Sequence, residues 1–79
     1  MIKDTYLVNK SDGHNKYYIV KCVKVNAERY ECTYGGFGKS PAMAEYTGDS
    51  TVQKKIQEKL KKGYEQVSKW EFEFIKTQS

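Results

Sequence analysis

One segment decides the fold of this chain: Cys32-Thr33-Tyr34-Gly35-Gly36-Phe37-Gly38-Lys39-Ser40. An aromatic residue ends a run of strand-forming residues there, and three glycines within four residues follow it. Because glycine adopts φ > 0 without steric cost, such a cluster predicts a sharp turn or a close backbone approach. We therefore expect a strand to end at Tyr34 and the chain to reverse over residues 35–40.

The residues before this loop predict three strands. Residues 5–8 are a short β-prone run, and the polar cluster 9–15 closes it with a turn. Residues 16–25 carry apolar side chains on both faces, which predicts a central strand, whereas residues 29–34 alternate cleanly between the two faces. The short connections between these runs favour an antiparallel sheet.

The pairing of the second and third strands depends on the length of their connection. A three-residue loop at 26–28 would place Cys22 opposite Cys32 and Val20 opposite Tyr34. A two-residue loop would instead place Ile19 opposite Tyr34. We prefer the first pairing because it gathers one apolar face from Tyr18, Val20, Cys22, Tyr30, Cys32 and Tyr34.

The residues after the loop predict a returning strand, a helix and a last strand. Residues 42–47 form the returning strand, with Pro41 at its first position. A helix then begins at residues 49–50, capped by Asp49 or by a capping box of Ser50 with Gln53. An apolar stripe with a spacing of four runs along it to a left-handed cap at Gly63: Val52, Ile56 and Leu60. After a linker over 64–68, alternation predicts a final strand whose core-facing aromatics are Trp70, Phe72 and Phe74.

These elements predict an α+β fold in a single domain over residues 1–79. We expect one small antiparallel sheet of about five strands packed against one α-helix. At 79 residues the core is small and leaves little room for a deep enzyme cleft. An edge strand of so small a sheet can pair with another copy, so we expect a monomer or a weak homodimer.

Composition narrows the partners and the compartment. The net charge of +4 favours nucleic acid or an acidic partner, although a solvated lysine-rich surface explains it equally well. The lysine-covered face of the predicted helix has the same two interpretations, a surface that contacts such a partner or a surface that is only solvated. No apolar run is long enough to span a membrane, and no leader peptide is recognisable, so we expect a cytoplasmic protein with no membrane partner. We expect Cys22 and Cys32 to be reduced core residues.

The motifs of catalysis are incomplete in this chain. The loop ends in Gly-Lys-Ser like a phosphate-binding loop, but the pattern needs a glycine at position 33, where Thr33 stands, and a helix after the lysine. His14 is the single histidine and belongs to a turn, and two cysteines with one histidine cannot complete a four-ligand zinc site. We therefore expect no enzyme, no metal site and no cofactor.

Several segments together resemble the WGR domain, the Trp-Gly-Arg module of poly(ADP-ribose) polymerases and bacterial WGR proteins. Residues 15–20, Asn-Lys-Tyr-Tyr-Ile-Val, look like the opening strand of the family. Residues 34–39, Tyr-Gly-Gly-Phe-Gly-Lys, stand where the Trp-Gly-Arg segment is expected, and residues 59–64 look like its helix end. The resemblance covers roughly residues 5–75, with Tyr34 in place of the tryptophan and Gly36 in place of the arginine.

This resemblance implies a stand-alone binding module that contacts DNA or another nucleic acid without catalysis. In the polymerases the segment helps to hold a DNA end, and its tryptophan stacks on a sugar. Tyr34 would stack with less area, and the arginine role is lost at Gly36 unless Lys39 replaces it. The expected contact residues are Tyr34, Gly35, Gly36, Phe37, Lys39, Lys16 and Lys21. The alternative is a protein-interaction module of the same fold without affinity for nucleic acid.

Overall fold

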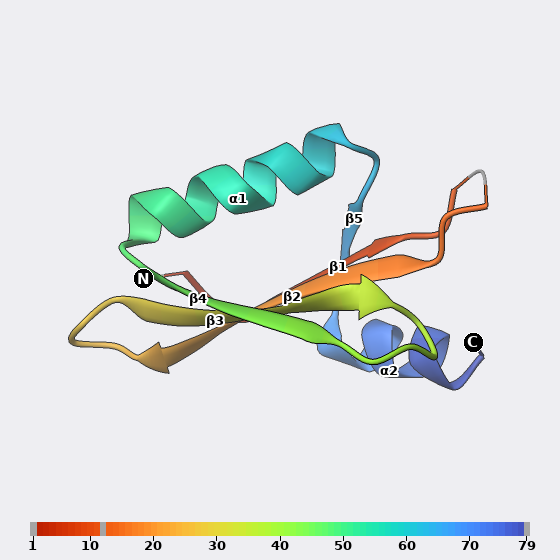
Figure 1. Ribbon diagram of the computed structural model, residues 1–79, viewed down its shortest axis with the longest axis horizontal. Coiled ribbons are helices and arrows are strands. Elements are labelled where there is room, and N and C mark those ends of the chain that lie inside the picture. The colour runs from red at the N-terminus through yellow and green to blue at the C-terminus, as the bar shows by residue number, and fades with distance from the viewer. Residues whose placement is uncertain (1, 12, 79) are drawn as a thin grey trace.

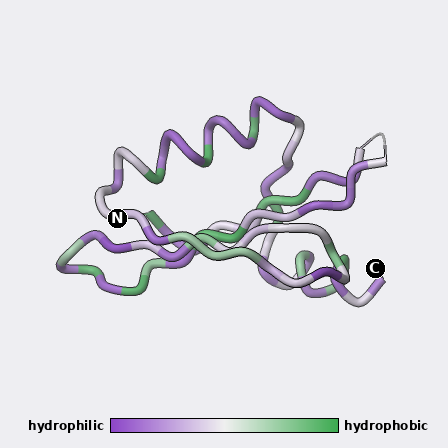
Figure 2. The backbone as a smooth tube through the Cα atoms, viewed as in Figure 1, coloured by the Kyte–Doolittle hydropathy of each residue, from purple (hydrophilic) through white to green (hydrophobic). Residues whose placement is uncertain are grey.

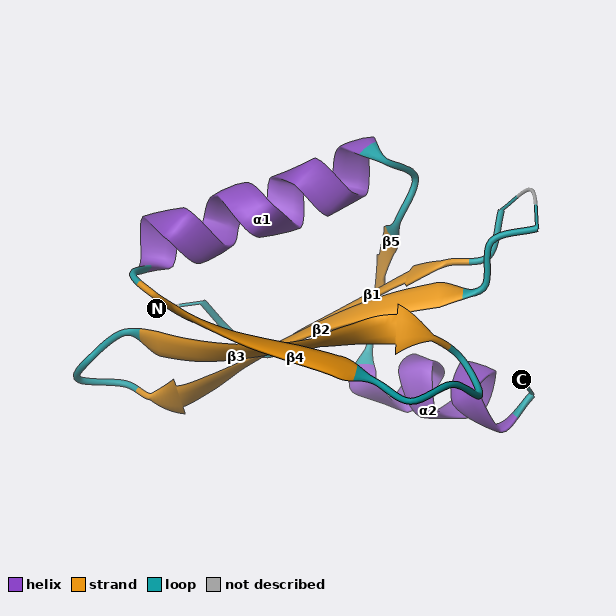
Figure 3. Cartoon of the chain, in the orientation of Figure 1, coloured by secondary structure: helices purple, strands orange, loops and turns teal. Residues whose placement is uncertain are grey.

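The computed structural model describes residues 2–11 and 13–78, so Asp12 of the predicted first turn lies outside the described residues. A five-stranded antiparallel sheet has a helix on each face (Figures 1 and 3). The elements in chain order are β1 Thr5–Asn9, β2 Lys16–Lys24, β3 Arg29–Gly36, β4 Ala42–Thr47, α1 Asp49–Lys61, β5 Glu65–Val67 and α2 Lys69–Thr77. The strand order across the sheet is β4-β3-β2-β1-β5. The α+β class with a five-stranded antiparallel sheet is therefore confirmed, and a second helix is added to it.

Two apolar clusters lie on opposite faces of the sheet. The cluster beneath α1 contains Leu7, Tyr18, Val20, Tyr30, Cys32, Val52 and Ile56. The cluster beneath α2 contains Tyr6, Val8, Phe37 and Phe72. All five residues of β1 are buried because helices cover that part of the sheet on both sides.

The predicted register between β2 and β3 is wrong by two residues. Val20 lies opposite Cys32, and Tyr18 lies opposite Tyr34. The connection is a four-residue turn, in which the Glu28 N–H donates to the Val25 carbonyl (3.1 Å), and the pairing is irregular between Cys22 and Lys24. A shift of two preserves the side-chain faces, because strand side chains alternate with a period of two. The predicted apolar face therefore forms despite the wrong register.

Helix α1 has the predicted stripe and the predicted end. Val52 and Ile56 are buried against the sheet, and Figure 2 shows the hydrophobic residues of α1 on the side toward the sheet. Gly63 follows the helix at φ +100, a conformation that favours glycine. Its N–H donates to the Leu60 carbonyl (3.2 Å), and the Tyr64 N–H donates to the Lys59 carbonyl (3.1 Å). These two bonds are the Schellman motif.

The predicted capping of α1 is wrong. Gly48 occupies the N-cap position, and the N-cap residue therefore has no side chain that could accept a hydrogen bond. The Asp49 N–H donates instead to Glu28 Oε1 (2.9 Å), and the Asp49 carboxylate accepts a hydrogen bond from the Tyr30 hydroxyl. The Tyr30 hydroxyl lowers the pKa of Asp49, and the same bond raises the pKa of Tyr30. Partners from β3 and from the preceding turn therefore replace the local cap.

The predicted final strand is also wrong. The short strand β5 lies within the predicted linker, and residues 69–77 form α2. The Ser68 Oγ accepts from the Glu71 N–H (3.0 Å), which is the N-terminal half of a capping box. Phe72 is 3% exposed, whereas Trp70 and Phe74 are 78% and 56% exposed and stack on each other at 6.3 Å. A helix turns positions 70 and 74 away from the sheet when position 72 faces it, so only one of the three aromatics joins the core.

Candidate nucleic-acid interface

The glycine loop is clamped to the beginning of β2. The Phe37 N–H donates to the Asn15 carbonyl (3.0 Å), and the Lys39 N–H donates to the Gly36 carbonyl (3.1 Å), which closes a tight turn. Gly35 and Gly38 have φ values of +148 and +81, a region that side-chain-bearing residues rarely adopt. The glycines therefore allow the chain to leave β3 and enter β4 within a few residues.

Tyr34 and Phe37 lie on opposite sides of the sheet. Tyr34 is 37% exposed on the α1 side, with its ring 5.8 Å from the ring of Tyr18. Phe37 is 6% exposed, with its ring 5.0 Å from Tyr17 and 5.7 Å from Phe72. Phe37 therefore supports the loop from the core beneath α2, whereas Tyr34 is the more exposed of the two rings and lies on the α1 side.

Lys16 and Lys39 both border Gly36 in the glycine loop, residues 35–40. Lys16 lies opposite Gly36 in the β2–β3 pairing. A Cβ atom on Gly36 would lie 3.3 Å from Lys39 Cδ, so the aliphatic part of Lys39 covers the place where a longer side chain at position 36 would begin. A hollow of about 320 Å³ is lined in part by Lys16, Gly36 and Lys39.

Lys21 lies apart from the other predicted contact residues. It lies opposite Glu31 in the middle of the β2–β3 pairing, and its side chain belongs to the α2 face, as does that of Ile19. The structure thus brings together Tyr34, Gly35, Gly36, Lys39 and Lys16, but it does not bring Lys21 to them.

The end of α1 adds two lysines to the same end of the sheet. A second hollow of about 190 Å³ is lined by Asn9, His14, Lys16, Lys59, Lys62 and Tyr64. Lys59 Nζ lies 5.1 Å from the centre of the Tyr18 ring and 5.5 Å from that of Tyr64. Lys16 lines both hollows, and we call Lys16, Lys39, Lys59 and Lys62 the basic edge. No described residue that lines either hollow is a carboxylate.

The position of the α1 end is fixed by a buried amide. Asn9 is almost fully buried at the end of β1. Its Nδ2 donates to the Lys62 carbonyl (3.5 Å), and its Oδ1 accepts from the Ser11 N–H (3.1 Å). The turn between β1 and β2 and the last turn of α1 are therefore held together, which places Lys59 and Lys62 beside the start of β2.

Lys59 is held at an electrostatic cost. Burial lowers the pKa of the Lys59 ammonium, and the neighbouring charges of Lys62 and Lys16 lower it further, while Glu58 opposes this change. Contact with two aromatic rings compensates part of that cost. A bound anion would stabilise the charged form of Lys59, because it would place a negative charge beside three neighbouring positive ones.

The basic edge was only partly visible in the sequence. The sequence offered the lysines of α1 as a group, without a reason to separate Lys59 and Lys62 from the rest. The available signal is their position in the last turn before Gly63, which places them beside the next segment of the chain. Their approach to Lys16 follows from tertiary packing through Asn9.

Cys32 and Tyr18 lie together in the core beneath α1. Cys22 and Cys32 are both free, and burial raises the pKa of the Cys32 thiol. Burial and a hydrogen bond with Cys32 raise the pKa of Tyr18. Both groups therefore stay protonated near neutral pH. Among the described residues, no group of three or more His, Cys, Asp or Glu side chains is placed to hold a metal ion.

Comparison with known proteins identifies no relative. No family model, no curated protein and no solved structure matches this chain. Within residues 2–11 and 13–78, neither helix is long and apolar enough to cross a membrane.

Proposed function

We propose that this chain is a WGR-like module that binds nucleic acid and has no catalytic activity. The observation that supports it is a partly exposed aromatic ring, Tyr34, whose neighbour Tyr18 carries Lys59 of the basic edge over its ring. Stacking on a sugar or a base together with lysine contacts to phosphates is the usual way to bind a strand without reading its sequence.

The chemistry of the basic edge suits a phosphate backbone. Each lysine that neutralises a phosphate releases condensed counterions, which drives binding at low salt. The rings of Tyr34 and Tyr18 lie 5.8 Å apart, and Lys59 Nζ lies 5.1 Å from the Tyr18 ring and 5.5 Å from the Tyr64 ring. Tyr18 is buried, so Tyr34 is the ring of this row that a strand would stack on. A backbone lying along the basic edge would contact Lys16, which lines both hollows, with Lys39 in one hollow and Lys59 and Lys62 in the other.

Position 36 explains how the site would work without the arginine of the resembled motif. The stem of Lys39 lies over Gly36, so its ammonium group would supply a cation near the place that the arginine would occupy. An ammonium group is a point charge and does not make the bidentate contact of a guanidinium group. We therefore expect phosphate contact with little base selectivity.

The test is a fluorescence anisotropy titration with nicked and blunt DNA duplexes and with a single strand, at several salt concentrations. Tyr34→Ala and Lys39→Ala should each weaken binding, while Tyr34→Phe should retain most of it because the ring is kept. Lys54→Gln, on an exposed part of α1 outside both hollows, controls for the loss of one charge. Absence of binding at low salt would refute the proposal.

The second candidate is a protein-interaction module of the same fold without affinity for nucleic acid. The stacked, exposed rings of Trp70 and Phe74 favour it, because exposed aromatics are enriched in protein interfaces. It predicts a stable partner that survives nuclease treatment and is lost on changing these rings. For either candidate we propose a cytoplasmic location, and a monomer or a weak dimer that pairs through the open edge of β4.

A further inference from the structure

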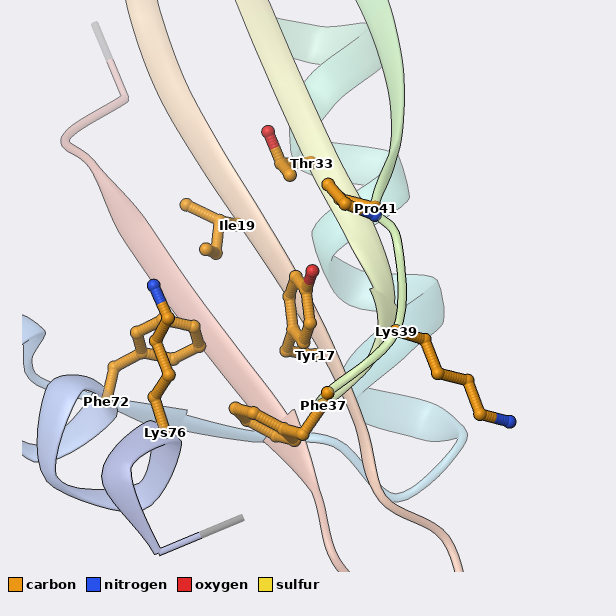
Figure 4. Close-up of a pocket in the computed structure, with 9 residues that line it drawn as sticks. Tyr17, Ile19, Thr33, Phe37, Lys39, Pro41, Phe72 and Lys76 are labelled. Carbon is orange, nitrogen blue, oxygen red and sulfur yellow. The ribbon is translucent and has the colours of Figure 1, made fainter.

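Helix α2 covers only part of its face of the sheet. It packs on β1 and on Phe37, so that β3 and β4 remain open on this side (Figure 1). Met43 of β4 is 59% exposed there. Between α2 and the open strands lies a groove of about 380 Å³, whose walls are Tyr17, Ile19, Thr33, Phe37, Pro41 and Phe72 (Figure 4).

The groove has an apolar floor and cationic sides. Lys76 of α2 and Lys39 of the glycine loop complete its lining, and no described lining residue is a carboxylate. In Figure 4 Lys76 extends beside Phe72 into the groove, whereas Lys39 points outward from its rim. The acidic side chain nearest along β3 on this face is Glu31, two residues from Thr33, and it lies opposite Lys21.

The rings of Phe37 and Phe72 on the groove floor are 6% and 3% exposed, so neither offers a free face to a nucleobase. The ring of Phe37 is covered by Tyr17 at 5.0 Å, by Phe72 at 5.7 Å and by Lys10 Nζ at 5.1 Å from its centre. Tyr17 meets Phe72 edge-on at 5.8 Å. Base binding requires an open π-face, whereas an aliphatic or aromatic side chain can fill a concave apolar hollow by contact alone.

We propose that this groove docks an acidic peptide segment of a protein partner, with one bulky apolar side chain inserted between α2 and β3 and its flanking carboxylates near Lys76 and Lys39. The groove volume is at the low end of the range for ligand sites, which suits one or two side chains. The positive sides select the acidic flanks by charge complementarity. This surface lies on the opposite face of the sheet from Tyr34, so it is independent of the nucleic-acid proposal except for the shared rim residue Lys39.

The experiment is an NMR titration of the labelled full chain with capped pentapeptides. The probe is Asp-Glu-Phe-Asp-Glu, and its matched controls are Asp-Glu-Ser-Asp-Glu and Lys-Lys-Phe-Lys-Lys. The proposal predicts saturable amide shifts at Ile19, Thr33, Phe37 and Lys76 with the probe alone. Equal shifts with either control peptide would overturn it, since then the apolar side chain or the acidic flanks would not matter.

Two variants test the groove separately. Thr33→Trp fills it and should abolish the shifts, provided that the amide spectrum shows a folded chain. Lys76→Glu changes only an exposed side chain and should weaken the probe by at least about fivefold, because an attraction becomes a repulsion. Lys54→Glu on α1 makes the same charge change on the other face and should leave the affinity unchanged. Equal weakening by both charge variants would refute a local site.

Two further outcomes would replace this occupant with another. Saturable shifts at the same residues with adenosine monophosphate would assign the groove to nucleic acid. Shifts that depend on protein concentration without any peptide would assign it to a second copy of the chain. The DNA titration with Tyr34→Ala reads a different face, so failure of the peptide test and failure of the nucleic-acid proposal are distinguishable.

Discussion

Replacing the three aromatics of the C-terminal segment one at a time distinguishes the helix from a strand. In a strand, Trp70, Phe72 and Phe74 would all face the core, and each change to alanine would be costly. In the helix α2, only Phe72 is buried, with its ring 5.3 Å from Tyr6 and 5.7 Å from Phe37. The structure therefore predicts one severe variant and two mild ones.

The magnitude follows from burial. Phe72→Ala removes a side chain that is 3% exposed, and truncation of a buried phenylalanine costs about 3–5 kcal/mol. Trp70→Ala and Phe74→Ala remove exposed rings and lose mainly their mutual stacking, so each should cost below about 1 kcal/mol. A domain of this length has a total stability of roughly 4–12 kcal/mol, so Phe72→Ala approaches the limit of folding.

Urea unfolding followed by far-UV circular dichroism measures these differences, with Phe72→Leu as a milder variant that keeps most of the apolar volume. In a thermal scan, a loss of about 3 kcal/mol lowers Tm by roughly 12–24 °C for a domain of this size. The reasoning would be refuted if Trp70→Ala and Phe74→Ala destabilised the protein as much as Phe72→Ala. Equal costs would mean that all three rings share the core, as alternation alone predicted.

Three other predictions concern the salt dependence of DNA binding, the end of helix α1 and the pH dependence of stability. If each of the four lysines of the basic edge neutralises one phosphate, a plot of log K for duplex DNA against log salt has a slope of about −3.6. Lys59→Gln should then reduce the slope to about −2.7, whereas Lys54→Gln should leave it unchanged. Gly63→Ala forces a side chain into φ +100 and should lower the free energy of unfolding in urea by about 1–2 kcal/mol, without changing the m-value. The hydrogen bond from the Tyr30 hydroxyl lowers the pKa of Asp49 in the folded state. This bond therefore stabilises the protein fully above the unfolded pKa of about 3.9, and the stabilisation is lost as the pH falls through the lower pKa of the folded state. Urea unfolding of Tyr30→Phe should therefore show a weaker loss of stability on acidification; an unchanged pH profile would contradict the bond.

The candidate site divides into a local part and a part that depends on packing. The turn after β3 was predictable from its glycines, but the expected strand end at Tyr34 was wrong. Strand β3 continues to Gly36, and Gly35 pairs with Tyr17 at φ +148. The burial of Phe37 was not predictable, because the helix that covers it was expected as a strand. Tyr34 and Phe37 are three residues apart, and only the arrangement of layers decides that one is half-exposed and the other is in the core.

The sequence by itself determined the features that depend on short-range periodicity. Alternation over residues 29–34 marked β3, the spacing of Val52 and Ile56 marked the buried stripe of α1, and Gly63 marked its end. The two periodic patterns are decisive because each one fits a single backbone period, and Gly63 is decisive because glycine readily adopts the left-handed conformation that ends a helix. The pattern of residues 70–74 is too short to separate a period of two from one of 3.6, and the cap at Ser68 was the stronger signal.

Tertiary structure alone decided the register of β2 with β3, the capping of α1 and the assembly of the basic edge. The register depends on a four-residue turn and an irregular pairing near Cys22, and neither is visible in the alternation of the two strands. Lys16 and Lys59 are 43 positions apart in the chain, and a buried amide at Asn9 brings their segments together. Such contacts arise only when the layers pack, because the periodicity of a segment shows which of its faces is buried but not which distant segment it will meet.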